Sequence, residues 1–311
     1  MCCLFGIHDY RSCFSKNQRN TILSILSTEC EARGTDATGI AYNANGKLSI
    51  FKRPLPARRM RYLTPDSAKV VMGHTRMATQ GNRKRNYNNH PFVGLAGNTL
   101  FAFAHNGIIH NDRYIRKEQN LPNTKIQTDS YIAVQLLERE NGLTFQSLAK
   151  MAETVNGSFT FTVLDNSDNL YFVKGDNPLC IYHFAGAGFY LYASTKEILD
   201  KAITRLGLNE LAHKEIPSQC GDIIRIDANG NITTSAFDTS ALYSFYYGCL
   251  RPYQYSFYED LCDYPDNEHL QIVHQMAGAF GYSPDDVDYL LSEGYTLDEI
   301  EDFFYEDEMC R

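Results

Sequence analysis

The sequence predicts an α+β protein in which stacked β-sheets are covered by helices. Short apolar runs bounded by Gly, Asn and Asp recur between residues 4 and 226, and each run predicts a strand. Helical periodicity is confined to a few stretches between these runs. A chain of 311 residues with 43% hydrophobic content has ample material for a core. Many strands and few helices together favour a sandwich of sheets between helices.

The charge is unevenly distributed and divides the chain into two regions. The net charge is −8, yet residues 259–311 carry sixteen Asp and Glu against the single Arg311, so the first 258 residues are positive. We therefore expect a domain over residues 2–240, an aromatic-rich linker over 241–266 and an acidic three-helix module over 267–311. An acidic module makes nucleic acid an unfavourable partner.

The chain opens with a helix and a hairpin. An apolar stripe predicts a helix from Gln18 to Arg33, which Gly34 ends. Strands over Ile40–Tyr42 and Lys47–Lys52 then flank Asn45-Gly46, a pair of residues typical of tight β-hairpin turns.

Three further segments place polar residues at the ends of predicted elements. Residues 70–75 form a buried strand ending at Arg76, whose guanidinium could grip a carboxylate or form a structural ion pair. Alternating apolar residues lead into Asn106-Gly107, which would form an ordinary turn or supply an oxyanion hole. A helix begins near Gln127, where Asp129 could cap it or receive an ammonium group.

The remainder of the domain is mostly strands. Strands are predicted over residues 158–164, 171–174, 180–184 and 190–193. A helix follows over about residues 195–206, and a strand starting at Gly221 closes the domain.

The first residues supply a complete nucleophile. Removal of Met1, which is usual before a small residue, would leave Cys2 with a thiol and a free α-amine. A free thiol has a pKa of about 8.5 and an α-amine one of about 7.7–8.0, so the amine can take the thiol proton near neutral pH. The apolar run from Leu4 to Ile7 predicts a strand that holds Cys2 at its tip.

No cofactor, metal or membrane site is expected. The nine cysteines contain no CxxC pair, which argues against a disulfide framework and a structural zinc site and favours a reducing cytoplasm. The sequence has no run of 18 apolar residues that would span a membrane, and its start lacks the pattern of a signal peptide.

The candidate residues lie within ten short strings that follow one another over residues 2–235. The strings are CCLFGI, RGTDATGIA, GHTRMATQG, NNHP, HNGII, TDS, GSFTF, DNPL, AS and GDI. In this order they resemble the class II glutamine amidotransferase domain of the N-terminal nucleophile hydrolases. The resemblance is greatest to the glutaminase domain of glucosamine-6-phosphate synthase and more distant to that of amidophosphoribosyltransferase.

The resemblance implies a four-layer αββα fold and hydrolysis of the side-chain amide of L-glutamine. Cys2 would attack that amide with its own α-amine as the base, and Asn106 and Gly107 would stabilise the oxyanion. Water would then hydrolyse the γ-glutamyl thioester to glutamate after ammonia has left.

The same resemblance assigns the groups that bind the substrate. Arg76 would bind the α-carboxylate of glutamine and Asp129 its α-ammonium, with Thr79 and His90 nearby. Met77 and Gln80 depart from the Trp and His of the synthase, so strict specificity for glutamine is open. The alternatives are a γ-glutamyl amide or peptide hydrolase of the same fold and a non-catalytic binding or scaffold protein.

The acidic tail contains an internal repeat. GYSPDDVDYLL from Gly281 and GYTLDEIEDFF from Gly294 each place a Ser or Thr, Ser283 or Thr296, before a helical pattern with an acidic residue three positions on. The tail is too short for an acceptor domain, so a separate ammonia-acceptor enzyme is expected. The module could dock on basic loops of its own chain, recruit a basic partner or only stabilise the domain, and the oligomeric state is not specified.

Overall fold

The computed structural model describes residues 2–240 and 282–292 together with a few others: Leu242, Leu270, Val273, His274, Ala277, Leu297 and Ile300. The chain divides into two units, Met1–Gly248 and Cys249–Arg311. Met1, nearly all of the aromatic-rich linker and most of the acidic module lie outside the described residues. The boundaries 2–240, 241–266 and 267–311 therefore stay predictions.

The first unit contains a seven-stranded antiparallel sheet with β1 (Cys3–His8) near its centre. The strand order is β11-β9-β10-β1-β4-β2-β3. The other strands are β2 (Ala37–Ala44), β3 (Lys47–Arg53), β4 (Val70–Arg76), β9 (Cys180–Phe184), β10 (Phe189–Ala193) and β11 (Lys214–Glu215). All six residues of β1 are buried, because strands flank it on both sides and the sheet is covered on both faces.

A six-stranded antiparallel sheet forms the other half of the unit. Its order is β13-β12-β8-β7-β6-β5. Its strands are β5 (Phe92–Ala96), β6 (Thr99–Ile109), β7 (Gly157–Asp165), β8 (Leu170–Lys174), β12 (Asp222–Ile226) and β13 (Ile232–Ala236). The longest strand, β6, pairs with β7 over nine registered residues from Phe101 to Ile109.

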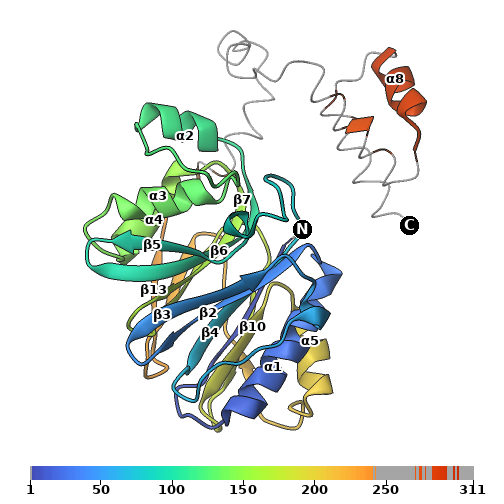
Figure 1. The fold of residues 1–311 in the computed structure, drawn as a ribbon. Coiled ribbons are helices and arrows are strands. Elements are labelled where there is room, and N and C mark those ends of the chain that lie inside the picture. Colours follow the sequence, from blue (N-terminus) through green and yellow to red (C-terminus); the bar gives the residue numbers. More distant parts are fainter. Residues whose placement is uncertain are drawn as a thin grey trace. The chain divides into compact units, whose positions relative to one another are not determined.

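Helices cover the outer face of each sheet, as Figure 1 shows. On the seven-stranded sheet lie α1 (Lys16–Glu29) and α5 (Lys196–Arg205), and on the other lie α3 (Tyr131–Glu138) and α4 (Phe145–Thr154), while α2 (Asp112–Glu118) packs next to α3. Three apolar clusters fill the spaces: one under each helical layer and one, including Leu4, Met72 and Phe172, between the sheets. The four-layer αββα architecture predicted from the sequence is confirmed.

Local sequence patterns account for the hairpin and for the start of helix α1. The predicted hairpin is present as β2 and β3, and both Asn45 and Gly46 have the positive φ angles, 52° and 73°, of a tight hairpin turn. Helix α1 starts earlier than expected, because Ser15 caps it through a reciprocal bond with Gln18. It ends at Glu29 and continues as the short 3₁₀ turn η1 (Cys30–Ala32); η2 (Ala57–Arg59) and η3 (Asn86–Asn88) are further 3₁₀ turns of the first unit.

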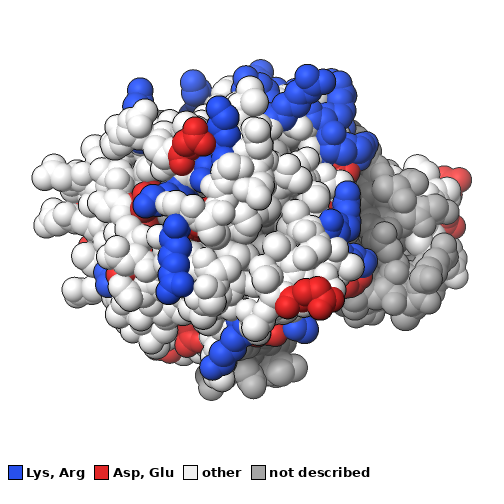
Figure 2. Space-filling view, turned by 90° about the horizontal axis from the view of Figure 1, so that it is seen from below, with Lys and Arg blue, Asp and Glu red and all other residues white. Residues whose placement is uncertain are grey.

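The surface of the first unit reflects its positive charge. Figure 2 shows Lys and Arg outnumbering Asp and Glu on the visible face and gathering along its upper edge. Arg58 and Arg83, both exposed, form ion pairs with Glu31 and Asp36. No helix in the described part of the chain is both long enough and apolar enough to cross a membrane.

The second unit is described mainly at helix α8 (Pro284–Ser292). Ser283 caps it as the sequence predicts, since the Asp286 N–H donates to the Ser283 hydroxyl and the Asp286 carboxylate accepts from the Ser283 N–H. Val287 is buried in a small cluster with Val273, Ala277 and Ile300. The second cap, at Thr296, lies outside the described residues.

Candidate active site

Strand pairing brings Cys2 and Arg76 together. In the register of β1 with β4, Cys3 lies opposite Thr75, so the preceding Cys2 faces Arg76 at the end of β4. The Cys2 thiol is directed to the backbone oxygen of Met77, with Sγ and O 3.5 Å apart. The Arg33 side chain donates from Nε to the backbone oxygen of Cys2 at 2.9 Å. Cys2 is thus held at the tip of a buried central strand, as predicted.

The environment of Cys2 is both desolvated and charged. The residue is partly exposed, but burial of the thiol raises its pKa. The hydrogen bond to Met77 and the positive charge of Arg76 oppose this increase, and the negative charge of Asp129 adds to it. Arg76 and Asp129 therefore both lie close enough to influence the thiol.

Arg76 is buried, with 3% of its surface exposed, and is held by residues of the connection between β4 and β5. Nη1 donates to the side-chain oxygen of Asn89 at 2.7 Å, and Nη2 donates to the backbone oxygens of Gln80 and Gly81. Burial lowers its pKa, while nearby Cys2 and Asp129 oppose this shift. The structure thus places a rigid guanidinium beside the cysteine.

Asp129 does not cap the following helix. It is 5% exposed, and its Oδ2 accepts a 2.7 Å hydrogen bond from the backbone N–H of Ile109 at the end of β6. The capping position of α3 falls on Ser130, whose side chain makes no cap bond. Instead the Ser130 hydroxyl donates to Asp129 Oδ1 at 3.3 Å and lies 2.8 Å from His105 Nδ1. A long-range bond from Ile109 and a local bond from Ser130 thus fix the orientation of the aspartate.

The turn expected at Asn106-Gly107 is not present. Strand β6 continues through both residues and pairs them with Thr160 and Phe159 of β7. Gly107 has a φ of 141°, and a Cβ there would lie 1.9 Å from the backbone oxygen of Ser158, so only glycine fits. The strand therefore presents both residues from inside the sheet rather than from a loop.

The Asn106 side chain is buried without a hydrogen-bond partner. It is 1% exposed, and neither its amide nitrogen nor its oxygen is paired. Leaving a buried polar group unsatisfied costs about 1–3 kcal/mol. An amide kept free at this cost is suited to bind an oxygen that the substrate brings.

His90 and Thr79 differ in their surroundings. His90 is 3% exposed and stacks between His74 and Phe92, at ring-centroid distances of 4.3 and 4.4 Å. Burial lowers its pKa well below the usual range, so the ring is neutral. Thr79 is exposed on the loop after Arg76. His90 therefore belongs to the buried surroundings of Arg76, while Thr79 sits on a surface loop.

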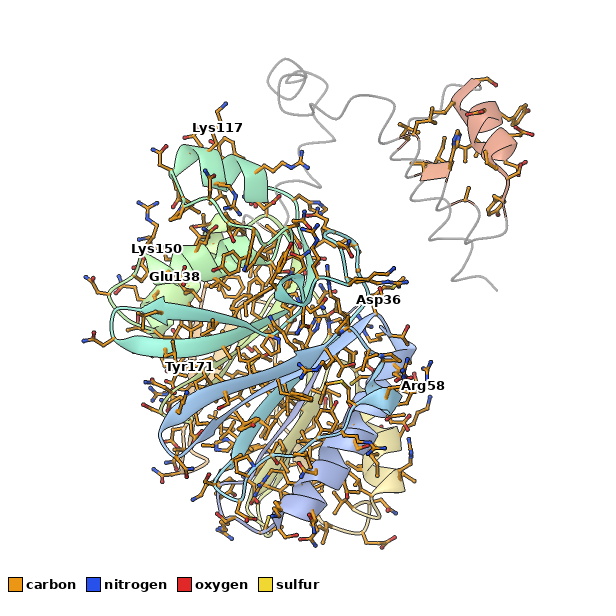
Figure 3. The ribbon with its side chains drawn as sticks, in the orientation of Figure 1. Asp36, Arg58, Lys117, Glu138, Lys150 and Tyr171 are labelled. Carbon is orange, nitrogen blue, oxygen red and sulfur yellow. The ribbon has the colours of Figure 1, made fainter. Side chains whose placement is uncertain are left out.

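Sequence reasoning missed two supporting residues, Asp36 and Asn89. Asp36 (Figure 3) accepts from the Ala78 N–H at 2.8 Å, and its own N–H donates to the Arg76 backbone oxygen, which fixes the start of the loop after β4. Asn89 accepts from Arg76, as described above. Both lie in strings already noted, RGTDATGIA and NNHP, but nothing local marks them as partners of Arg76.

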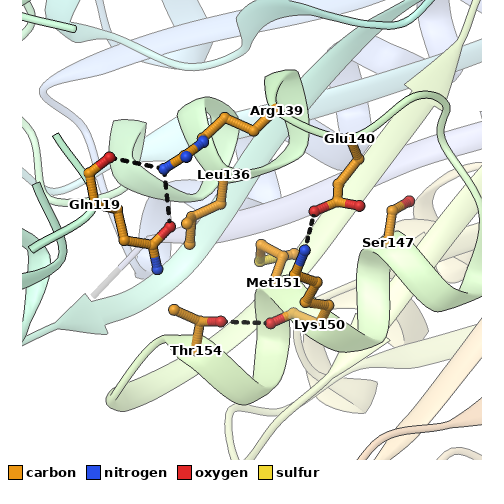
Figure 4. Close-up of a pocket in the computed structure, with 8 residues that line it drawn as sticks. All are labelled: Gln119, Leu136, Arg139, Glu140, Ser147, Lys150, Met151 and Thr154. Carbon is orange, nitrogen blue, oxygen red and sulfur yellow. Dashed lines mark hydrogen bonds and ion pairs between the residues drawn. The ribbon is translucent and has the colours of Figure 1, made fainter. Parts of the chain in front are cut away.

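A hollow between two helices of the first unit lies apart from the predicted site residues. A hollow of about 220 Å³ between α3 and α4 is lined by residues bonded to one another, such as Lys150 with Glu140 and Arg139 with Gln119 (Figure 4). It contains none of the predicted site residues. Among the described residues, no group of three or more His, Cys, Asp or Glu is arranged to hold a metal ion.

The chain is similar in sequence to glutamine amidotransferase domains. Residues 74–201 match the family described as the glutamine amidotransferase domain. Glutamine–fructose-6-phosphate aminotransferase of Staphylococcus epidermidis is 30% identical over 204 residues, which are 62% of this chain and 32% of that protein. The enzyme of the same name from Sulfurisphaera tokodaii is 31% identical over 198 residues, 61% of this chain and 33% of that protein. The chain thus spans about a third of the length of these relatives.

Solved structures show the same fold. Glutamine phosphoribosylpyrophosphate amidotransferase from B. subtilis superimposes with a TM-score of 0.59 at 19% identity, over 77% of this chain and 50% of that one. A structure of the allosteric regulatory enzyme of purine biosynthesis gives a TM-score of 0.61, also at 19% identity, with the same coverage.

The first unit therefore has the fold of the amidotransferases among the N-terminal nucleophile hydrolases. More particularly, residues 74–201 match the glutamine amidotransferase domain family, and the chain is related in sequence to glutamine–fructose-6-phosphate aminotransferase.

Proposed function

We propose that Cys2, once Met1 is removed, hydrolyses the side-chain amide of L-glutamine through a γ-glutamyl thioester. The observation that carries this proposal is that Arg76 ends β4 opposite Cys2, and the charges of Arg76 and Asp129 both act on the Cys2 thiol. A cation and an anion beside one nucleophile match the carboxylate and ammonium of an amino acid whose side chain reaches that nucleophile.

The reaction follows from these positions. The raised pKa of Cys2 means that the thiol needs a base, and the freed α-amine of the same residue, with a pKa of about 7.7–8.0, supplies one. The sulfur attacks the amide carbon, and the unpaired Asn106 amide with the Gly107 N–H stabilises the oxyanion. The protonated amine then gives its proton to the departing ammonia. Water attacks the thioester, and glutamate leaves.

Substrate recognition is assigned to four residues around this nucleophile. Arg76 binds the α-carboxylate of glutamine, and Asp129 binds the α-ammonium. His90 supports the buried surroundings of Arg76, and Thr79 contributes from the loop that follows it. The ammonia passes to an acceptor enzyme, in keeping with relatives whose names describe transfer of an amino group to fructose 6-phosphate.

The test is a mass measurement on the purified protein before and after incubation with a glutamine analogue that carries a diazoketone. Loss of Met1 and a single adduct on Cys2 are expected, together with release of glutamate and ammonia from glutamine. Cys2→Ala should form no adduct and release no ammonia while keeping its thermal unfolding temperature. Cys13→Ala, at an exposed cysteine, is the matched control and should behave as wild type.

Two results would replace the proposal. Faster cleavage of γ-glutamyl peptides or amines than of glutamine would make the protein a γ-glutamyl hydrolase, a result for which the departures at Met77 and Gln80 leave room. A processed protein with a free Cys2 that cleaves no amide at all would make it a binding or scaffold protein.

A further inference from the structure

A lysine on an edge strand reaches the segment that supports Arg76. Lys52 lies on β3, and its Nζ donates to the backbone oxygens of Asn89 and, at 2.8 Å, of Pro91. The same nitrogen lies 5.0 Å from the centroid of the Phe92 ring. The ammonium therefore bridges the two residues on either side of His90.

A glycine makes this contact possible. Gly39 is the register partner of Lys52 on β2, and a Cβ at Gly39 would lie 2.2 Å from the His90 backbone oxygen and 2.7 Å from Lys52 Cβ. The segment that contains His90 thus packs directly on β2, with Lys52 beside it. The Asn86 side chain donates to the Lys52 backbone oxygen at 2.8 Å and adds a second tie between strand and segment.

Asn89 connects this segment to Arg76. It is fully buried, and its side-chain oxygen accepts from Arg76 Nη1 at 2.7 Å. Its side-chain nitrogen donates to the Arg83 backbone oxygen at 3.0 Å. Lys52 holds the backbone of Asn89, and Asn89 in turn orients the guanidinium.

Lys52 and Arg76 are also coupled by charge. Burial and then the positive charge of Arg76 lower the pKa of Lys52 to about 8. Two neighbouring cations repel each other, and a bound carboxylate would relieve that repulsion. Both cations therefore favour an anion at this point.

We propose that Lys52 is a positioning residue for the substrate α-carboxylate, because its ammonium clamps the Asn89–Pro91 segment that orients Arg76. This inference rests on the proposed glutaminase function. Lys52 acts through Asn89 and Arg76 and is not itself assigned a contact with the substrate.

The test compares Lys52→Met with Lys47→Met, a control at the exposed end of the same strand. Near neutral pH, K52M is expected to raise KM for glutamine about tenfold, the effect of losing a charge-assisted hydrogen bond, with kcat changed far less. K47M should leave both constants unchanged. A KM for K52M equal to that of wild type overturns the proposal.

The pH dependence separates positioning from a structural role. Since the wild-type ammonium loses its proton near pH 8, the ratio of KM between K52M and wild type should fall as the pH rises through about 8. Lys52→Arg, which keeps its charge over this range, should restore a low KM near neutral pH and abolish the change. A KM ratio that is the same at every pH contradicts the proposal.

A further measurement separates this inference from the proposed function. If wild-type protein with a free Cys2 does not hydrolyse glutamine, the proposed function fails, and the clamp is judged by amide hydrogen exchange over residues 86–92. Faster exchange in K52M than in K47M supports the clamp, and equal exchange overturns it.

Discussion

Strand β1 has a titratable side chain at each end, and the two ends differ in what surrounds it. Cys2, just before the strand, lies within the influence of Arg76 and Asp129. His8, its last residue, is fully buried beside the rings of Tyr10 and Tyr190, at centroid distances of 6.2 and 6.1 Å.

The contrast between the two ends indicates that burial alone does not make a chemical site. Burial lowers the pKa of His8 to about 4, although the carboxylates of Asp227 and Asp9 oppose the shift. His8 is therefore neutral near neutral pH and packs as an aromatic ring. At the Cys2 end, by contrast, Arg76 at the end of β4 and Asp129 before α3 bring opposite charges near a thiol. We infer that groups at the first end serve the reaction and those at the other end serve stability.

Among the variants that test this division between reaction and stability, Asn106→Ala is expected to have the largest effect. We expect kcat/KM for glutamine to fall by about 10²–10³, because one oxyanion donor is lost. Stability should change little, since the Asn106 side chain has no hydrogen-bond partner to lose. Glutaminase kinetics and thermal unfolding measure the two effects.

Asn111→Ala is the matched control. The Asn111 side chain donates to the Thr154 backbone oxygen and accepts from the Asn156 N–H, so this variant should lose about 1–3 kcal/mol of unfolding free energy and keep its activity. If Asn106→Ala instead lowered stability and left kcat/KM intact, Asn106 would belong with the structural groups.

Much of the fold was readable from the sequence, because its signals are local. Apolar runs located the strands, Asn45-Gly46 located the hairpin, and Ser283 located a helix start. The strings from Cys2 onward identified the domain type. The resemblance carried by those strings, rather than any local signal, grouped Cys2, Arg76, Asn106-Gly107 and Asp129 into one site.

The failures concern residues whose environment is set from far along the chain. The local sequence predicts a possible turn at Asn106-Gly107, but β6 continues through both residues because it pairs with β7, and the nearby Ser158 backbone oxygen leaves room only for glycine. Position alone allows Asp129 to cap the following helix, yet its carboxylate accepts a hydrogen bond from the distant Ile109 N–H instead. The bond from Asn89 to Arg76 also depends on tertiary packing, which no local pattern encodes.

Arg76→Lys is expected to have a smaller effect on activity than Asn106→Ala. The substitution keeps the positive charge but removes the planar guanidinium. Lysine cannot bind a carboxylate through two parallel hydrogen bonds while also reaching Asn89. We expect KM for glutamine to rise by about tenfold to a hundredfold, with a lesser change in kcat. Steady-state kinetics on the processed enzyme measure the changes in KM and kcat, and an unchanged KM would show that Arg76 has only a structural role through its bonds to Asn89, Gln80 and Gly81.

The smallest effect on activity is expected from His8→Phe, which should leave glutaminase kinetics unchanged near neutral pH. Its effect lies in acid stability. The folded-state pKa of His8 is about 4 and the unfolded value about 6.5, so between these values only the unfolded chain binds the proton. Stability supplied by neutral His8 is therefore lost as the pH falls from about 6.5 to 4, by at most about 3 kcal/mol.

His8→Phe removes this loss, so its acid unfolding midpoint should move to lower pH, as followed by circular dichroism. His74 on β4, whose pKa is lowered to about 3 mainly by burial, remains in this variant and still destabilises the protein in acid. The unfolding midpoint of His8→Phe should therefore shift only in part. His110→Phe, at an exposed histidine, is the control and should unfold in acid as wild type does. A variant at His8 that lost activity near neutral pH while remaining folded would break the division between the two ends of β1, because the site would then depend on packing at the far end of the strand.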